Sequence, residues 1–221
     1  MTSSRWDKAQ DAEKNYWSST KLGWSKDNRK LYWQEILYHG FGLDYDFFSN
    51  KDVLEIGCGP SGIIFQIDTA KSRVGIEPMD LSGLVEEDWK RTIVKKAVGE
   101  KLPFDNSSFD IVISFNALDH SLNPERVIRE THRVLRDNGD FLLWIYALRE
   151  IYEPLQGILN RLDPPHPHHF TFSEIKSKVN NNSFHIKNGW YEKGTGLRND
   201  TIKNLFGNLM MNRAWIWSKK I

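Results

Sequence analysis

The chain has 221 residues, 39% of them hydrophobic and 27% charged, which suits one folded domain with a buried core. The formal net charge is +1 and the basic residues are spread out, which argues against nucleic-acid binding through a strong positive field. No segment approaches the roughly 18–20 apolar residues of a membrane span, and no apolar secretory segment is visible at the N-terminus. The single cysteine, Cys58, excludes an intrachain disulfide, so we expect a cytoplasmic protein without membrane or nucleic-acid partners.

From residue 53 onward, strand-like and helix-like segments alternate, as in a parallel sheet wrapped by helices. Strands are expected at residues 53–56, 73–76, 110–115, 141–146, 185–188 and 214–218. The best-marked helix has Asn123 as its N-cap and Pro124 at its first position, with Asn138 and Gly139 as a left-handed stop. Other helices are expected at 63–70, 148–162 and 173–179, with a proline-broken loop at 163–169 and Thr171 or Ser173 as a cap. Residues up to about 49 look helical and aromatic, and the basic residues at 90–96 suggest a solvated helix face.

A glycine-rich turn follows the first expected strand, because residues 52–62 read DVLEIGCGPSG. Glycines permit a tight turn and let the backbone approach a ligand at a helix N-terminus, but G-x-G-x-x-G alone also marks dinucleotide-binding folds. Glu55, where such folds usually keep an apolar residue, and Pro60 in the turn distinguish this sequence from them. Glu77 ends the second expected strand, where a carboxylate can accept hydrogen bonds from two ribose hydroxyls of either NAD or S-adenosylmethionine (SAM). The alternative is an exposed carboxylate that only caps the strand.

Several further motifs follow this loop in order. They are Glu55-x-Gly57-x-Gly59, Gly75-Ile-Glu77-Pro, Leu102-Pro-Phe104 with Ser108-Phe109-Asp110, Leu118-Asp-His120, and Glu130-x-x-Arg133-Val-Leu135-x-x-x-Gly139. The ordered set resembles the class I SAM-dependent methyltransferases, in particular the small-molecule branch related to ubiquinone and sugar methylases, over roughly residues 50–146. The resemblance implies a doubly wound α/β fold with a Rossmann-like seven-stranded sheet, mostly parallel, whose antiparallel final strand is residues 214–218. It also implies a helical lid segment at 1–49 and a methyltransferase domain at 50–221, with a helical insertion at about 148–180.

The same resemblance assigns cofactor-binding residues by position. The methionine part of SAM would be held by Glu55, Gly57 and Gly59, and the ribose by Glu77. The face of the adenine would lie against Pro78 or Met79, and its edge would contact Gly99 and Glu100. The sulfonium end would be lined by Asn116. One departure is Val98, where the family often has an acidic or amide residue that bonds the adenine amino group. Either Glu100 or backbone groups then make that contact, or SAM is bound more weakly.

The function that the resemblance implies is SAM-dependent methyl transfer, by in-line displacement, to a hydroxyl, amine or carbon of a small molecule. Alignment of the reactants is the main requirement, a general base helps a hydroxyl or a protonated amine, and no metal is required. His120 is the candidate base because histidine titrates nearest neutrality, although its position also suits a structural hydrogen bond. The alternative function is a SAM-binding regulatory or partner protein without methylation activity, and a third reading is an NAD-type oxidoreductase, which Glu55 and Leu102-Pro-Phe104 disfavour.

Two further segments are candidates for acceptor binding. The loop Asp163-Pro-Pro-His166-Pro-His168-His169 holds three histidines in four residues, which also invites a metal reading. Because the spacing gives no helical i, i+4 pair, a structural loop or an acceptor contact through His168 and His169 is favoured over a metal site. Near the N-terminus, Tyr16 and Trp17 are the best candidates for a lid over the acceptor, and anchoring of packed helices is the alternative.

Overall fold

The computed structural model describes residues 10–11, 13–15, 17, 26–82, 91–163, 166–193 and 209–221. Its sheet has seven strands in the order β3-β2-β1-β4-β5-β7-β6. Their bounds are β1 Asp52–Ile56, β2 Ser72–Ile76, β3 Ile93–Lys95, β4 Phe109–Phe115, β5 Leu135–Leu148, β6 Phe184–Lys193 and β7 Met211–Lys220. All neighbours pair in parallel except β7, which is antiparallel to both β5 and β6. The expected seven-stranded sheet with an antiparallel final strand is confirmed.

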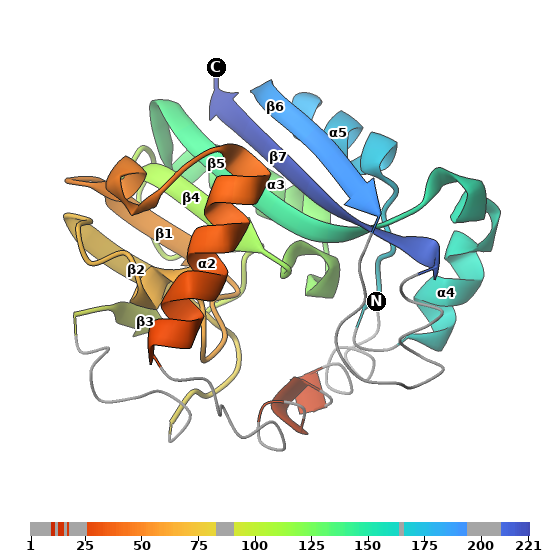
Figure 1. Ribbon diagram of the computed structural model, residues 1–221, viewed down its shortest axis with the longest axis horizontal. Coiled ribbons are helices and arrows are strands. Elements are labelled where there is room, and N and C mark those ends of the chain that lie inside the picture. The colour runs from red at the N-terminus through yellow and green to blue at the C-terminus, as the bar shows by residue number, and fades with distance from the viewer. Residues whose placement is uncertain are drawn as a thin grey trace.

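Helices cover both faces of this sheet (Figure 1). The α-helices are α2 Lys26–Phe41, α3 Pro124–Val134, α4 Gln156–Leu162 and α5 Phe172–Asn180, and the short 3₁₀ helices are η1 Tyr45–Phe48, η2 Ile63–Phe65, η4 Leu118–His120 and η5 Glu150–Leu155. In Figure 1, α2 crosses the near face of the sheet while α3 and α5 lie behind it. Two hydrophobic cores result, one beneath α3 and α5 and one beneath α2, η1 and η2. None of the helices in the described ranges is long and apolar enough to cross a lipid bilayer.

The aromatic residues near the two ends of the chain hold α2 against the sheet. Gly40 in α2 faces Trp215 of β7 so closely that a Cβ atom on Gly40 would lie 2.1 Å from the indole ring. The Trp190 indole of β6 stacks on Trp215 with ring centroids 4.6 Å apart and donates a hydrogen bond to the Gly40 carbonyl. Trp33 of α2 donates to the carbonyl of Ser61 at 2.9 Å. These rings join α2 to the last two strands and to the glycine-rich loop.

Three expectations about local structure are wrong. The helix expected at 63–70 is only the three-residue η2, because Ile63, Ile64, Phe65 and Ile67 are all buried and leave no polar face, and β2 begins at Ser72. The basic stretch at 90–96 contains the edge strand β3 rather than a solvated helix. The stop of α3 is not Asn138-Gly139: the helix ends at Val134 and Leu135 is already extended.

The other elements lie where the sequence predicts them, with longer bounds. Asn123 accepts a hydrogen bond from the backbone amide of Arg126 and so caps α3, as expected. Thr171 caps α5 through a reciprocal capping box with Glu174. Strand β6 is longer than predicted and contains a register shift between Ile186 and Asn188, which leaves Lys187 without a partner residue on β7. The expected helix at 148–162 is divided into η5 and α4.

Candidate active site

The glycine-rich loop joins the carboxyl ends of β1 and β2. The amides of Gly57 and Cys58 both donate to the carbonyl of Ile76, the last residue of β2, at 2.8 and 3.2 Å. Gly57 and Gly59 have φ angles of +72° and +50°, which glycine adopts far more readily than other residues. A Cβ atom on Gly57 would also lie 2.4 Å from the Cβ atom of Ala117, which follows β4. The loop therefore needs glycine at both positions, and at Gly57 it also needs the space.

Glu55 lies beneath the loop with 1% of its surface exposed. Its Oε2 atom accepts a hydrogen bond from the amide of Ile64 at 2.9 Å. Burial raises the pKa of its carboxyl to about 8, although the amides of Ile64 and Ile63 oppose the shift. A Cβ atom on Gly62 would lie 2.5 Å from Oε2, so the third glycine of the motif provides room for this carboxylate. Glu55 thus holds the two ends of the loop together, and its contact with a ligand stays a prediction.

Glu77 connects the end of β2 to the same loop. It is 8% exposed, and its two carboxylate oxygens accept hydrogen bonds from the amides of Gly59 and Met79, both at 3.0 Å. Burial raises its pKa, and these two amides lower it in part. The alternative of an exposed strand cap is wrong, because Glu77 is buried and bonded to the loop. Each carboxylate oxygen has a second lone pair that a ligand hydroxyl can use.

Asn116 follows β4 and closes the opposite side of the loop. Its φ angle is +50°, and its amide donates to the carbonyl of Trp144 at 2.7 Å. Within the described part of the chain, its side-chain Oδ1 atom is buried and has no hydrogen-bond partner. A buried polar atom without a partner is unfavourable, so this atom is suited to accept a hydrogen bond from a ligand.

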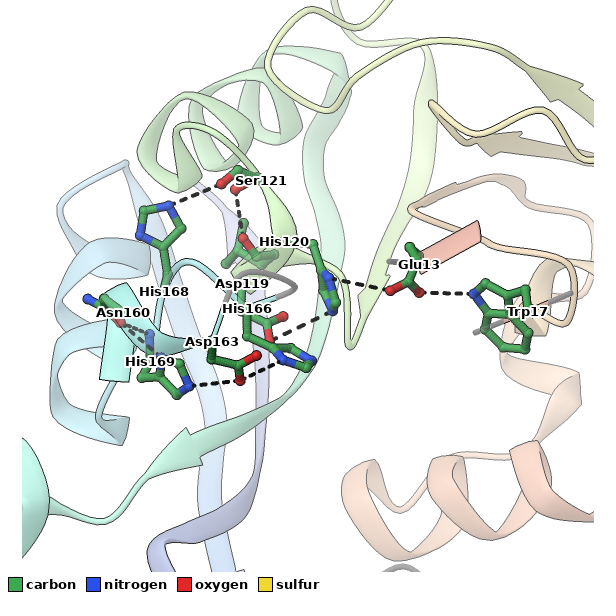
Figure 2. A network of polar contacts seen from close by, with 11 residues as sticks. Glu13, Trp17, Asp119, His120, Ser121, Asn160, Asp163, His166, His168 and His169 are labelled. Carbon is green, nitrogen blue, oxygen red and sulfur yellow. Dashed lines mark hydrogen bonds and ion pairs between the residues drawn. The ribbon is translucent and has the colours of Figure 1, made fainter. Parts of the chain in front are cut away.

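A polar network lies just beyond Asn116, around η4 (Figure 2). His120 has Nδ1 3.9 Å from a carboxylate oxygen of Glu13 and Nε2 4.0 Å from one of Asp119. The ring of His166, from the loop before α5, lies 4.6 Å from the His120 ring, and Asp163 contacts His166 Nδ1 at 3.0 Å. The histidine loop and η4 are therefore adjacent, which neither segment indicates on its own.

His168 and His169 lie on the other side of this network. His168 Nε2 is 3.0 Å from the carbonyl of Ser121, and its ring stacks on Phe170. His169 is 7% exposed, and Asn160 Oδ1 accepts hydrogen bonds from both its backbone amide and its Nδ1 atom. These contacts hold the loop against η4 and α4, and a contact of either histidine with an acceptor stays a prediction.

Trp17 and Glu13 bring the N-terminal segment to the site. The Trp17 ring lies 3.7 Å from where a Cβ atom on Gly59 would be, and its indole nitrogen donates to Glu13 at 2.9 Å. Glu13 in turn faces His120. The pair therefore connects the glycine-rich loop to η4, as a covering segment would. Tyr16, predicted together with Trp17, lies outside the described residues.

Comparison with known proteins identifies the central part of the chain, since residues 54–143 match the methyltransferase domain family. An uncharacterised protein of Methanocaldococcus jannaschii is 35% identical over 109 residues, 48% of this chain and 41% of that protein. A probable S-adenosylmethionine-dependent methyltransferase of Saccharomyces cerevisiae is 32% identical over 114 residues, 48% of this chain and 39% of that protein. The solved structure of a putative sarcosine dimethylglycine methyltransferase from Galdieria sulphuraria superposes with a TM-score of 0.69 at 13% identity, covering 96% of this chain and 98% of that one.

Residues 54–143 belong to the methyltransferase domain family, and the relatives and solved structures support a class I SAM-dependent methyltransferase. The cofactor that this family implies is SAM. The alignments cover less than half the length of the two curated relatives described above.

Two of the methyltransferase motifs form a structural clamp. The Arg133 guanidinium donates to the carboxylate of Glu130 and to the carbonyls of Leu102 and Phe104. Glu130 also accepts from the amide of Leu102 at 2.9 Å. The motif residues at 102–104 and 130–133 are therefore two halves of one contact, which holds the segment before β4 against α3.

The adenine-edge candidates of the methyltransferase have structural partners as well. Glu100 Oε1 accepts from the amides of Leu122 and Asn123 at 2.7 and 3.0 Å, at the beginning of α3. A Cβ atom on Gly99 would lie 2.9 Å from Ile56. Glu100 thus connects the segment after β3 to the start of α3, and its contact with adenine stays a prediction.

Sequence reasoning did not single out Glu13 and Asp119. It named Asp163 and His166 as part of the histidine loop, for which a metal site was considered and disfavoured. Asp119 lies in the motif that was noted for His120, so its residue type was visible but the direction of its side chain was not. Glu13 is one helical turn before Trp17, which was the available signal. Their convergence depends on contacts between segments far apart in the sequence.

Proposed function

We propose that this chain transfers a methyl group from SAM to a small-molecule acceptor bound where β1, β2 and β4 end. The observation that carries the proposal is buried Glu77, which directly follows β2 and accepts a hydrogen bond from the amide of Gly59 in the loop. The carboxylate and the glycine loop therefore form one preformed unit. In an open α/β sheet, ligands bind at the carboxyl ends of the strands beside such a loop.

The residues fit SAM in three respects. Glu77 retains lone pairs for ribose hydroxyls, Gly57 and Gly59 keep the loop backbone free of side chains, and the unpartnered Oδ1 atom of Asn116 can accept a hydrogen bond. We place Pro78 or Met79 against the adenine. When bound, SAM supplies a methyl group already activated by its positively charged sulfur.

The remaining side chains would act on the acceptor. We propose that Trp17 covers the loop and excludes water, with Glu13 holding its indole. His120 lies between Glu13 and Asp119 and is the candidate to take a proton from an acceptor hydroxyl or ammonium group. His168 and His169 border the same region, as contacts for the distal part of the acceptor.

Calorimetry on the full chain tests the cofactor assignment. We expect S-adenosylhomocysteine to bind with micromolar affinity or better and NAD not to bind. Glu77→Ala should weaken S-adenosylhomocysteine at least tenfold, because a charge-assisted hydrogen bond is worth about 1.5–3 kcal/mol. Glu153→Ala, which removes an exposed carboxylate from η5, is the matched control. A loss below threefold for Glu77→Ala would remove the ribose role, and NAD binding alone would overturn the proposal.

A screen for S-adenosylhomocysteine release tests turnover. A panel of small hydroxyl, amine and activated-carbon acceptors should contain at least one substrate whose product gains a single methyl group. Binding of the cofactor with no release against any acceptor would favour the alternative of a SAM-binding protein without methylation activity.

A further inference from the structure

The polar network around η4 contains a cluster of one carboxylate and two histidines. Methyl transfer that depends only on alignment of the reactants does not need such a cluster. Asp119, His120 and His166 each offer one potential metal-ligand atom, and these three atoms lie within 4.8 Å of one another. Asp119 is buried, and the two histidines are partly exposed. Figure 2 shows the three side chains converging from two segments, η4 and the loop before α5. A carboxylate with two imidazoles is a ligand set that divalent transition metals prefer.

Asp119 provides a second, independent observation. It is only 4% exposed, and its Oδ1 atom has no hydrogen-bond partner in the described ranges. His120 Nε2, at 4.0 Å from Oδ2 of Asp119, is too far away for a hydrogen bond. A buried carboxylate without a close partner is costly, so the site favours a cation that the chain itself does not supply.

The outer nitrogens of both histidines face carboxylates. Asp163 Oδ2 lies 3.0 Å from Nδ1 of His166, and Glu13 Oε2 lies 3.9 Å from Nδ1 of His120. This leaves Nε2 of His166 for a ligand, and Nε2 of His120 already faces Asp119. Metal-binding histidines usually bond a carboxylate or carbonyl through their second nitrogen, which orients the ring and raises its basicity.

Three carboxylates surround the same place, because Asp119 and Glu13 face His120 and Asp163 contacts His166. Their negative charges attract a metal cation. His169 contacts Asp163 at 3.4 Å and is itself hydrogen-bonded to Asn160. The carboxylate of Asp163, which contacts His166, is therefore held in position by a second residue.

We propose that Asp119, His120 and His166 bind one divalent transition-metal ion, with Asp163 orienting His166 through a hydrogen bond and Glu13 facing the outer nitrogen of His120. Three protein ligands leave coordination positions open. The ligand class for those positions is an acceptor with an oxygen donor, such as a hydroxyl group, whose pKa a metal lowers. This inference rests on the proposed function only for the identity of the acceptor. With a metal bound, Nε2 of His120 is a ligand and cannot take up a proton, so the acceptor hydroxyl releases its proton to solvent water; without metal, His120 remains the candidate base.

Metal titration of the full chain, without SAM or acceptor, tests the site. After dialysis against EDTA, Zn²⁺ calorimetry at pH 8 should show one ion per chain with micromolar affinity or better. Co²⁺ should give visible absorption bands of a nitrogen- and oxygen-bound ion. His120→Gln and Asp119→Asn should each weaken Zn²⁺ at least 30-fold, and Asp163→Asn should weaken it about 10–100-fold. His185→Gln, which changes an exposed histidine of β6, is the matched control and should bind like the unmodified chain.

The outcomes separate this inference from the proposed function. Absence of a one-to-one Zn²⁺ isotherm, or equal affinity in the unmodified chain and in His120→Gln, would overturn the metal site. Circular dichroism and S-adenosylhomocysteine binding of each variant establish that it is folded, and His120→Gln, a partly exposed position, remains informative should Asp119→Asn unfold. Metal binding without S-adenosylhomocysteine binding would instead retain the site and contradict the proposed function.

Discussion

The two sides of the active site differ in how completely the chain satisfies its own polar groups. On the β1–β2 side, the buried carboxylates of Glu55 and Glu77 accept backbone amides at 2.9–3.0 Å. On the β4 side, Oδ1 of Asn116 and Oδ1 of Asp119 have no partner among the described residues, and the carboxylate contacts of His120 are 3.9 and 4.0 Å. The buried carboxyl groups of the first side have partners within the chain, whereas the second side keeps unpartnered oxygens that a ligand can use. Changes on the first side should therefore alter stability, and changes on the second should mainly alter binding.

The largest expected effect is a pH dependence from Glu55. Its pKa is about 8 in the folded chain against an ordinary 4.5, so the folded chain keeps a proton that the unfolded chain releases. Stability should thus fall as pH rises from about 5 to about 8 and then level off. Glu55→Gln cannot titrate, so between pH 5 and 9 its free energy of unfolding should rise relative to the unmodified chain by up to about 4 kcal/mol. Urea denaturation without SAM measures this, and parallel curves for both proteins would contradict it.

Gly57→Ala should have the next largest effect. The left-handed φ angle and the 2.4 Å approach to Ala117 together predict a loss of about 2–4 kcal/mol of stability and at least tenfold weaker S-adenosylhomocysteine binding. Gly157→Ala is the control, because a Cβ atom there meets nothing within 4 Å and lies in helix α4, so about 0.5–1 kcal/mol should be gained. Equal melting temperatures for Gly57→Ala and the unmodified chain would show that the loop is not preformed.

Glu100→Ala tests whether Glu100, an adenine-edge candidate, stabilises the fold as Glu55 and Glu77 do or binds the cofactor. The change leaves the amides of Leu122 and Asn123 without their acceptor, so the free energy of unfolding should fall by about 1.5–3 kcal/mol. S-adenosylhomocysteine affinity, measured by calorimetry well below the melting temperature, should stay within threefold. A tenfold loss of affinity would instead support the adenine contact that the family resemblance implies.

The smallest effect on stability is expected for Asn116→Gly. Glycine accommodates the φ angle of +50°, and the lost Oδ1 atom has no partner in the described structure, so stability should change by less than about 0.5 kcal/mol. S-adenosylhomocysteine binding should nevertheless weaken at least fivefold. If Asn116→Gly lowered the stability and left binding unchanged, Asn116 would have a structural role like that of Glu55 and Glu77. The proposed difference between the two sides of the site would then not hold for Asn116.

The sequence predicted what depends on local pattern and left out what depends on distant contacts. Strand β1 is short and mostly apolar, β4 is a longer and mostly apolar run, and α3 carries both a cap and a polar face, so all three were predicted. The helix expected at 63–70 failed because η2 packs on several sides at once, which short-range periodicity does not reveal. The glycine-rich loop was found as a motif, but the use of Gly62 to accommodate Glu55 depends on the folded geometry of the loop. The convergence of Asp119 with His166, 47 positions later, likewise has no local signal.

The register shift in β6 has a consequence for how this molecule behaves in a crowded solution. Among the described strands, β6 pairs only with β7, so its outer backbone forms an edge of the sheet that another chain could extend by strand addition. The shift at Lys187 interrupts that edge, and its ammonium group lies 3.5 Å from the centre of the Trp217 ring. An irregular edge carrying a charged side chain is a poor template for intermolecular sheet growth. The same local irregularity that lengthens β6 by one residue should therefore help to keep copies of this protein from aggregating through their sheets.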